Sequence, residues 1–412
     1  MPMILFLNDT ADHDNWGANA CSEWLKRILS DAIPETAYTS VMSHWTTDRF
    51  YQWPMWLGGR IVKRRPQVIG RFMHPFEFLP AVADDFERIA DQWCSGHGGP
   101  FASEFLSRLS GSDAVVFNAE GSTYRNNTSS IRCLFALWLA STRFKKYTFF
   151  TNGSLTLTPV FPILNAMVQK TFSAVTAASV REPCSLDNAR DWIPKVPVAL
   201  FPDSVFYAAG RIEEHETPEI TDLLRSVNNK SYFCMSLSML TSSIGRYHAG
   251  GIRLTGLYDL LIALKQVVPV AVLMARDGMD QSIIRDLARA TGSFFFGPHH
   301  HYSTLLPLLR SAQFLVSGRY HHLIMAALAG CPVIPLRTTS HKVDGLCRLM
   351  HPFFGTAYDP TWLRPELDTV TERARELVAC RKTMMESLQT AASDMGRRAS
   401  GIGTMIREGM GL

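Results

Sequence analysis

A fixed cation and a titratable imidazole, Arg319 and His321, stand where the sequence predicts that a strand ends and a helix begins. Residues 314–318 run from apolar side chains into Ser-Gly, and residues 321–330 are helix formers that stop at a glycine. In open α/β sheets, ligands bind at the carboxyl ends of strands, and helix N-termini attract anions. The pattern therefore predicts a site for an anionic substrate. The alternative is that Arg319 is a surface charge and His321 a hydrogen-bonded core histidine.

Other basic residues follow predicted strands and would surround the same cleft. Guanidinium groups bind carboxylates and phosphates through paired hydrogen bonds, so a basic rim suits a small phosphorylated or carboxylated substrate. An imidazole titrates near neutral pH, which makes His248 and His321 the acid–base candidates. The expected rim consists of Arg181, Arg246, Arg253, Arg319 and Lys342, with Ser317 at the end of the strand.

A second group of polar residues follows other predicted strands. Asn15, Gly17 and Asn19 stand at the start of a predicted helix, a place for an anion or a sugar hydroxyl. Taken singly, each is better explained as an ordinary turn or capping residue. Glu120 and Ser122 lie in the loop that follows another predicted strand.

Five histidines, at 299–301 and 321–322, raise the question of a metal. Three consecutive histidines cannot all point at one ion from regular backbone, and HExxH and CxxC spacings are absent. We therefore predict no metal site. The two loops are expected to leave neighbouring strands of one sheet, so residues 299–301 would line the same cleft as His321.

Short motifs that mark common enzyme classes are missing from the sequence. It has no GxxxxGK[ST] and no GxGxxG, which removes the usual signals for nucleoside triphosphate hydrolysis and for hydride transfer. It also has no GxSxG, which argues against a hydrolase with a serine nucleophile. We expect no cofactor.

Strands and helices alternate along the chain, which is typical of parallel α/β domains. The fold class is therefore α/β, with two Rossmann-like doubly wound domains facing a cleft. The expected limits are 1–210, 211–365 and a helical segment 366–412 that crosses back. The last is expected only by analogy with known two-domain α/β folds. The predicted strands are 3–7, 113–118, 147–151, 174–179, 198–201, 231–237, 268–274, 294–296, 314–316 and 332–336.

Length and composition support a globular protein. The 412 residues suit two or three domains, and 46% apolar with 19% charged residues excludes a disordered chain. A net charge of +4 is too small to indicate nucleic acid as a partner. The eight cysteines form no disulfide framework, and the N-terminus reads as a strand and not a signal peptide. These features indicate reduced thiols in a cytoplasmic protein.

The stretch 44–71 combines clustered aromatic residues with a basic run. Such a composition fits a peripheral membrane contact or stacking on sugars. A loop insertion with its own small core is favoured, because tryptophans are usually buried.

The segment SGRYHHLIMAALAGCPVIPL, followed by His341-Lys342-Val343-Asp344-Gly345-Leu346, resembles the C-terminal signature of the polysaccharide pyruvyl transferases. Weaker resemblances appear in the expected order. They are Asn15-Trp-Gly-Ala-Asn19, Glu120-Gly-Ser122, Val180-Arg-Glu182 followed by Ser185, and Phe201-Pro-Asp-Ser204. The glycine-rich loop of the family is replaced here by Asn118-Ala-Glu-Gly121, and the stretch 44–71 has no counterpart.

This resemblance implies a GT-B-like fold and transfer of a pyruvyl group from phosphoenolpyruvate onto two hydroxyls of a sugar, forming a ketal. The acceptor would be a polysaccharide precursor, either a sugar or a lipid-linked oligosaccharide. Carried over by motif, His321 would be the acid–base group, and Arg319 and Arg181 would hold the donor. Lys342 and His248 are weaker candidates. Two alternatives stay open: a GT-B glycosyltransferase with a nucleotide-sugar donor, and a non-catalytic glycan-binding protein.

Overall fold

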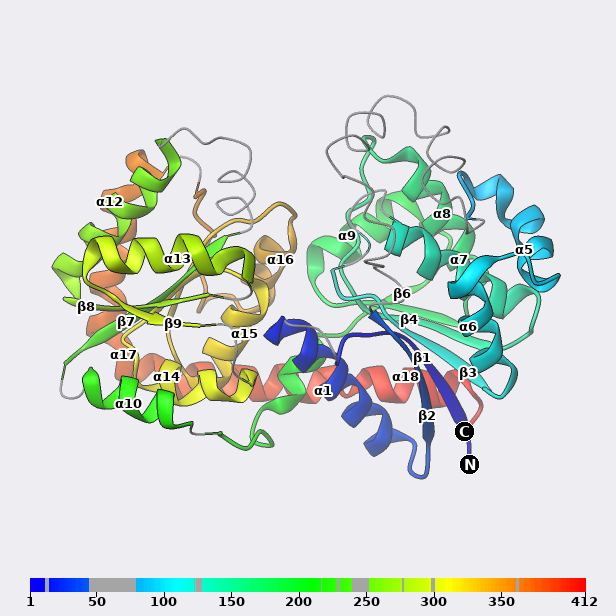
Figure 1. The fold of residues 1–412 in the computed structure, drawn as a ribbon. Coiled ribbons are helices and arrows are strands. Elements are labelled where there is room, and N and C mark those ends of the chain that lie inside the picture. Colours follow the sequence, from blue (N-terminus) through cyan, green and yellow to red (C-terminus); the bar gives the residue numbers. More distant parts are fainter. Residues whose placement is uncertain are drawn as a thin grey trace.

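The structure is a computed structural model with two parallel sheets, each covered by helices (Figure 1). It describes residues 1–11, 15–43, 79–121, 123, 128–215, 217–227, 230–238, 252–275, 278–297, 301–360 and 363–412. Several predicted features lie outside the described residues: the aromatic and basic stretch 44–71, Ser122, Arg246, His248, His299 and His300.

The first sheet has the strand order β2-β1-β3-β4-β5-β6, and every neighbouring pair is parallel. Its strands are β1 (Met3–Asp9), β2 (Ala37–Met42), β3 (Ala114–Asn118), β4 (Tyr147–Gly153), β5 (Ala177–Val180) and β6 (Val198–Leu200). The accompanying helices are α1 (Trp16–Ala32), α5 (Phe86–Cys94), α6 (Gly99–Ser110), α7 (Thr128–Thr142), α8 (Pro162–Phe172) and α9 (Pro183–Trp192), with 3-10 turns at Ala83–Asp85 and Ser204–Ala208. The order reverses between β1 and β3, so their carboxyl ends form the topological switch point where such sheets bind ligands.

The second sheet has the order β11-β10-β7-β8-β9 and is also parallel. Its strands are β7 (Tyr232–Ser238), β8 (Val270–Met274), β9 (Phe294–Phe296), β10 (Leu315–Gly318) and β11 (Val333–Pro335). Its helices are α10 (Pro218–Ser226), α12 (Ile252–Val267), α13 (Gly278–Thr291), α14 (Leu305–Ser311), α15 (Tyr320–Ala329) and α16 (Lys342–Leu349), with a 3-10 turn, η3, at Tyr302–Thr304. Here the switch point lies between β7 and β10. Because β7 and β8 separate β9 from β10, the prediction that the loops at 299–301 and 321–322 leave neighbouring strands is wrong.

Two terminal helices, α17 (Leu363–Ala399) and α18 (Gly401–Gly409), run along both domains (Figure 1). Gly330 ends α15 in the left-handed conformation with φ 74°, and α17 packs on it through Met385. Farther along, α18 packs on α1 so closely that a Cβ at Gly403 would lie 2.5 Å from the Cβ of Ala32. This return of the chain completes the GT-B-like α/β architecture expected from the sequence.

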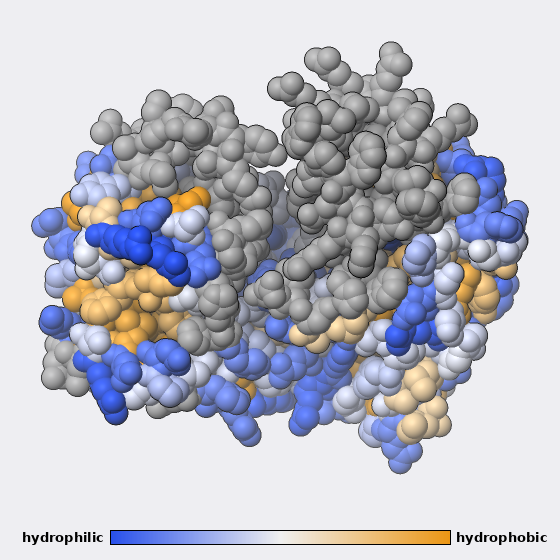
Figure 2. Space-filling view, in the orientation of Figure 1, coloured by the Kyte–Doolittle hydropathy of each residue, from blue (hydrophilic) through white to orange (hydrophobic). Residues whose placement is uncertain are grey.

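One apolar core cluster spans both domains, in addition to a separate cluster in each of them. A single cluster of buried side chains includes Trp16 and Ile28 of α1, Leu323 of α15 and Leu388 of α17. The Trp16 ring lies 5.5 Å from the ring of His322, measured between centroids, and so joins the two domains. Figure 2 shows hydrophilic residues over the lower middle of the molecule, where α1 and α18 lie in Figure 1. Among the helices that the structure describes, none has the length and apolarity needed to cross a membrane.

Candidate functional site

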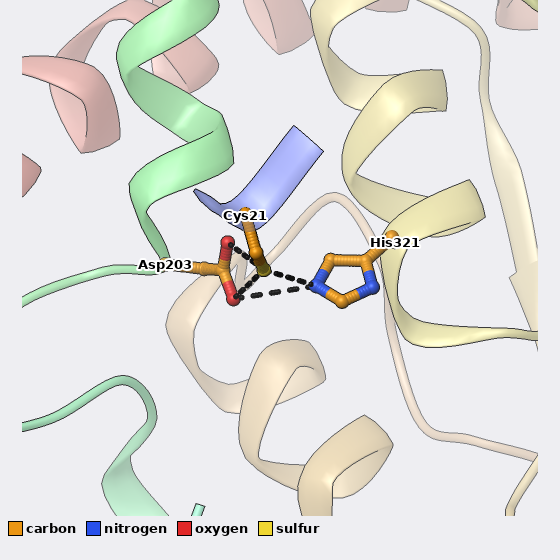
Figure 3. A group of neighbouring side chains, drawn as sticks. All are labelled: Cys21, Asp203 and His321. Atoms are coloured by element: carbon orange, nitrogen blue, oxygen red, sulfur yellow. Dashed lines mark hydrogen bonds and ion pairs between the residues drawn. The ribbon is translucent and has the colours of Figure 1, made fainter. Parts of the chain in front are cut away.

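The switch points of the two sheets meet at His321. This residue lies in the first turn of α15, directly after β10, and its ring reaches the first domain (Figure 3). Nε2 of His321 lies 3.0 Å from Sγ of Cys21 on α1 and 3.5 Å from Oδ2 of Asp203. The imidazole retains 11% of its side-chain exposure, whereas Asp203 is fully buried. A histidine held by a buried carboxylate at a domain boundary is arranged as an acid–base group.

Asp203 is ionised because three groups hold its carboxylate. Burial alone would raise its pKa, but the hydrogen bond and charge of His321 and the charge of Arg181 together hold the pKa well below its usual range. Arg181 donates from Nη1 to Oδ2 at 2.7 Å, and the backbone N–H of Val205 donates to Oδ1 at 3.0 Å. The negative charge is therefore fixed beside Nε2 of His321.

Arg181 is a fully buried guanidinium that contacts several parts of the site. Nε donates to Oγ of Ser154 at 2.9 Å, and the guanidinium carbon lies 4.4 Å from the centroid of the Tyr320 ring. Burial would lower the pKa of Arg181, but the negative charge of Asp203 raises it, so the guanidinium stays charged. Burial also raises the pKa of Tyr320 well above its usual value, so its hydroxyl stays protonated.

A second cation approaches Arg181 at the exit of β3. A Cβ placed on Gly121 would lie 3.9 Å from Nη2 of Arg181 and 4.0 Å from Nζ of Lys342. The two nitrogens are thus within about 8 Å of each other, one from each domain. Glu120, next to Gly121, has φ 42°, in a region that non-glycine residues rarely adopt. Two cations above Gly121, which has no side chain, form a place for an anion. The carboxylate of Glu120 is also close enough to act on the charge of Arg181.

Strained backbone recurs at the carboxyl edge of the first sheet. Asn8 and Asn152, which have φ 63° and 55°, are the next-to-last residues of β1 and β4. Nδ2 of Asn8 donates to the carbonyl of Asn118 at 2.8 Å, and Nδ2 of Asn152 donates to Oδ1 of Asn118 and to Oγ of Ser204. Such strain clusters at functional sites, where the surrounding hydrogen bonds hold it.

Gly17 leaves room for the other edge of the His321 ring. A Cβ on Gly17 would overlap Nδ1 and would lie 2.6 Å from the Cβ of His321. Asn15 is the N-cap residue of α1, and its Oδ1 accepts a hydrogen bond from the backbone N–H of Gly17 at 3.1 Å. Asn19 lies one turn along the helix and is half-buried. Asn15 thus has the capping role that the alternative interpretation gave it, and Gly17 adjoins the imidazole.

Arg319 and Ser317 are buried inside the second domain. Arg319 forms an ion pair with Asp280 at the start of α13, and the Arg319 side chain is 4% exposed. Oγ of Ser317 accepts a hydrogen bond from the backbone N–H of Arg319 at 2.9 Å and lies 2.7 Å from Oγ of Ser236. These contacts fix the turn from which His321 projects.

The structure therefore brings together His321, Arg181, Lys342, Gly17 and Glu120 from the predicted set. Arg253 lies in the first turn of α12. His301 contacts Glu23 of α1, with Nε2 3.8 Å from Oε2. Sequence reasoning missed Cys21, Asp203 and Tyr320 as site residues. Asp203 had a signal in the Phe-Pro-Asp-Ser motif, whereas Cys21 is a lone cysteine on a helix.

Among the described residues, the ligand atoms of Cys21, Asp203 and His321 lie within 4.8 Å of one another, close enough to hold a metal ion. The charges fit a cation poorly, because the guanidinium of Arg181 already neutralises Asp203. Burial, with the charge of Asp203, raises the pKa of Cys21 well above that of a free thiol. The cluster is therefore best described as a hydrogen-bonded group in which Arg181 balances the charge of Asp203.

The fold and the two facing switch points define a two-domain α/β protein of the GT-B type. Over 99% of this chain and 96% of the other, it resembles a UDP complex of MnaA from S. aureus at a TM-score of 0.55 and 12% identity. A putative UDP-N-acetylglucosamine 2-epimerase from Listeria monocytogenes matches at a TM-score of 0.53 and 13% identity. The match covers 98% of this chain and 94% of the other. UGT2 from Phytolacca americana, complexed with UDP-2fluoro-glucose and pterostilbene, matches at a TM-score of 0.54 and 10% identity. The match covers 98% of this chain and 100% of the other.

At these identities the solved structures establish the fold alone. A comparison with curated protein sequences finds no match. The model of the polysaccharide pyruvyl transferase family matches residues 15–340. This range includes β10, α15 and the cluster formed by Cys21, Asp203 and His321. The chain belongs to the polysaccharide pyruvyl transferase family, and this membership places it among transferases that act on polysaccharide.

Proposed function

We propose that the protein transfers a pyruvyl group from phosphoenolpyruvate to two hydroxyls of a sugar in a cell-surface polysaccharide or its precursor. The observation that carries this proposal is the approach of Arg181 and Lys342 to Gly121 beside a histidine with a buried carboxylate partner. The donor has a phosphate and a carboxylate, and Nη2 of Arg181 and Nζ of Lys342 would each donate hydrogen bonds to one of them. Family membership supports the reaction class.

His321 would move the protons. Nε2 faces Asp203, so a proton held there leaves Nδ1, on the Gly17 edge of the ring, as the atom that exchanges protons with substrate. In the first step, Nδ1 protonates the methylene carbon of the donor while a sugar hydroxyl attacks the oxocarbenium-like carbon. Asp203 stabilises the imidazolium, as a carboxylate partner does for other catalytic histidines.

The second step closes the ketal. The second hydroxyl attacks the same carbon, and the bond between that carbon and the phosphate oxygen breaks. Of the two hydroxyl protons, one ends on the new methyl group through His321, and the other leaves with inorganic phosphate. Arg181 and Lys342 would stabilise the departing phosphate.

Arg319 and Ser317 were predicted to contact the donor directly. Because both side chains are buried inside the second domain, we propose that they act instead through the turn before His321. Arg246 and His248 follow β7 in the sequence but lie outside the described residues, and they stay proposed for the donor. Asn15, Gly17, Asn19, Glu120 and Ser122 are proposed for the acceptor, on the side of the first domain. The proposed location is the cytoplasm. For residues 44–71 a loop insertion stays the favoured interpretation, with contact to a membrane surface as the alternative.

Thermal stability with ligands tests the donor. Phosphoenolpyruvate at a hundred times its Kd should raise the unfolding free energy by about 2.7 kcal/mol, an increase of a few degrees in Tm. The competing donor class is a nucleotide sugar, since the S. aureus and Phytolacca americana structures hold UDP or a UDP sugar. Stabilisation by UDP sugars with none from phosphoenolpyruvate would replace pyruvyl transfer with glycosyl transfer.

A further inference from the structure

The carboxylate of Glu182 lies between two helices that belong to different domains. Glu182 is the N-cap residue of α9, where its Oε2 accepts a hydrogen bond from the backbone N–H of Ser185 at 3.1 Å. Its Oε1 lies 3.2 Å from Nε2 of His341, the residue that precedes α16 in the second domain. The Glu182 side chain is fully buried, while that of His341 is 21% exposed. The carboxylate thus joins the two domains away from water.

The backbone of α16 packs directly on this carboxylate. A Cβ on Gly345 would overlap Oε2 of Glu182 and would lie 2.7 Å from its Cδ. Glu182 is therefore at the N-terminus of both α9 and α16, where helix dipoles favour a negative charge. A contact this close fixes the distance between the two helix starts.

The residues that flank this contact in sequence are the two proposed donor cations. Arg181 precedes Glu182, and Lys342 follows His341. Nη2 of Arg181 and Nζ of Lys342 approach the same point above Gly121. Since one cation comes from each domain, their separation depends on how the domains are held together. Glu182 and His341 make the adjacent cross-domain contact that sets it.

We propose that Glu182 and His341 are positioning residues that bring Lys342 to Arg181 and so complete the anion site from its two halves. This inference rests on the proposed function, in which the two cations hold phosphoenolpyruvate. Neither Glu182 nor His341 is assigned contact with the substrate. Each acts through the cation beside it.

His341→Ala is the informative variant, because the His341 side chain forms no capping hydrogen bond to α16. Its loss removes the cross-domain contacts of the imidazole with Oε1 of Glu182 and Oγ of Ser185, keeps the packing of Gly345 on Glu182, and leaves both helix caps intact. His341→Gln is the conservative variant, since its amide N–H can still donate to Glu182. Arg348→Ala is the matched control. It removes another contact between α16 and α9, Nη1 of Arg348 to Oδ2 of Asp187 at 2.7 Å, through side chains that are about half exposed and contribute little.

Kinetics with phosphoenolpyruvate separate positioning from general damage. His341→Ala should raise the donor KM about tenfold, the effect of losing one charge-assisted hydrogen bond, with a much smaller change in kcat. His341→Gln should recover most of this loss, and Arg348→Ala should match the wild type. In a Lys342→Met background, His341→Ala should have no further effect. An unchanged donor KM in His341→Ala would overturn the proposal. So would an equal rise in donor KM in the wild-type and Lys342→Met backgrounds.

Hydrogen exchange provides a readout that needs no donor. His341→Ala, but not Arg348→Ala, should speed amide exchange at the starts of both 183–192 and 342–349 while leaving 401–409 unchanged. If the wild type fails to bind phosphoenolpyruvate, the proposed function fails, and this exchange pattern alone decides the contact. Equal exchange in His341→Ala and the wild type would then overturn the positioning role.

Discussion

Arg181 donates a hydrogen bond to Asp203 at 2.7 Å, and both side chains are almost completely buried. The same carboxylate oxygen of Asp203 lies 3.5 Å from Nε2 of His321, on the other domain. One carboxylate therefore serves both the proposed donor clamp and the proposed acid–base group. Because the carboxylate bridges the domain boundary, changes to it should affect stability and chemistry together.

Asp203→Asn keeps the shape of the side chain and removes its charge. It leaves the Arg181 guanidinium buried without an ionic partner, so we expect a loss of roughly 3–5 kcal/mol in unfolding free energy. Loss of the partner of His321 should lower kcat at least about a hundredfold. Chemical denaturation and phosphate release measure the two effects. Asp222→Asn, in an exposed ion pair with Arg225, is the control and should change neither.

The pH dependence of stability follows from the lowered pKa of Asp203. A depressed folded-state pKa gives stability that is fully present above the unfolded value of about 3.9 and is lost as the pH falls toward the folded value. The difference in unfolding free energy between the wild type and Asp203→Asn should therefore stay constant from about pH 7 to 5 and narrow below about pH 4. Urea titrations at several pH values test this. If the difference in unfolding free energy between the two proteins grew as the pH fell, Asp203 would not be held ionised.

Much of this fold was predictable because parallel strands buried on both faces appear as continuous apolar runs. Both sheets and the helix 320–329 follow from that pattern and from Gly330. Strand β2, Ala37–Met42, was missed because it is a half-exposed edge strand without such a run. The Leu305–Ser311 helix was missed because Pro307 interrupts it. Whether a strand lies at the edge of a sheet, and whether a helix can contain a proline, depends on how the rest of the chain packs around it.

The site was only partly predictable, for a related reason. Arg319 and His321 are two residues apart in sequence, yet Arg319 pairs with Asp280 inside its domain while His321 crosses to Asp203. Sequence spacing places both residues where a strand ends, but it does not show which way either side chain points. Cys21 enters the site only because α1 packs against the second domain.

Gly17→Ala tests the space beside His321. The added Cβ would overlap Nδ1, so the ring or α1 must shift, at a cost of about 1–3 kcal/mol. If Nδ1 is the reacting nitrogen, activity should fall much further than stability does. Gly111→Ala is the matched control, since a Cβ there meets nothing within 4 Å. Full activity in Gly17→Ala would exclude the Nδ1 edge from catalysis.

Chelation tests the cluster formed by Cys21, Asp203 and His321. Because Arg181 neutralises Asp203 and the raised pKa keeps Cys21 protonated, we expect dialysis against EDTA to leave Tm and turnover unchanged. Added zinc should give no stabilisation. Elemental analysis of the purified protein checks the same point. Bound zinc in a stoichiometric amount, or inactivation by EDTA that zinc restores, would show that the cluster is a metal site.

Lys342→Met separates donor binding from folding. Lys342 is half-buried at the start of α16, and methionine keeps the length of its apolar stem while removing the ammonium. A charge-assisted hydrogen bond contributes about 1.5–3 kcal/mol, so the KM for phosphoenolpyruvate should rise roughly ten- to a hundredfold. The Tm without ligand should stay within about a degree of the wild type. Lys146→Met is the control, because Lys146 is also half-buried but precedes β4, at the opposite edge of the first sheet. An equal rise in KM in both variants would mean that net charge, and not the position of Lys342, governs donor binding.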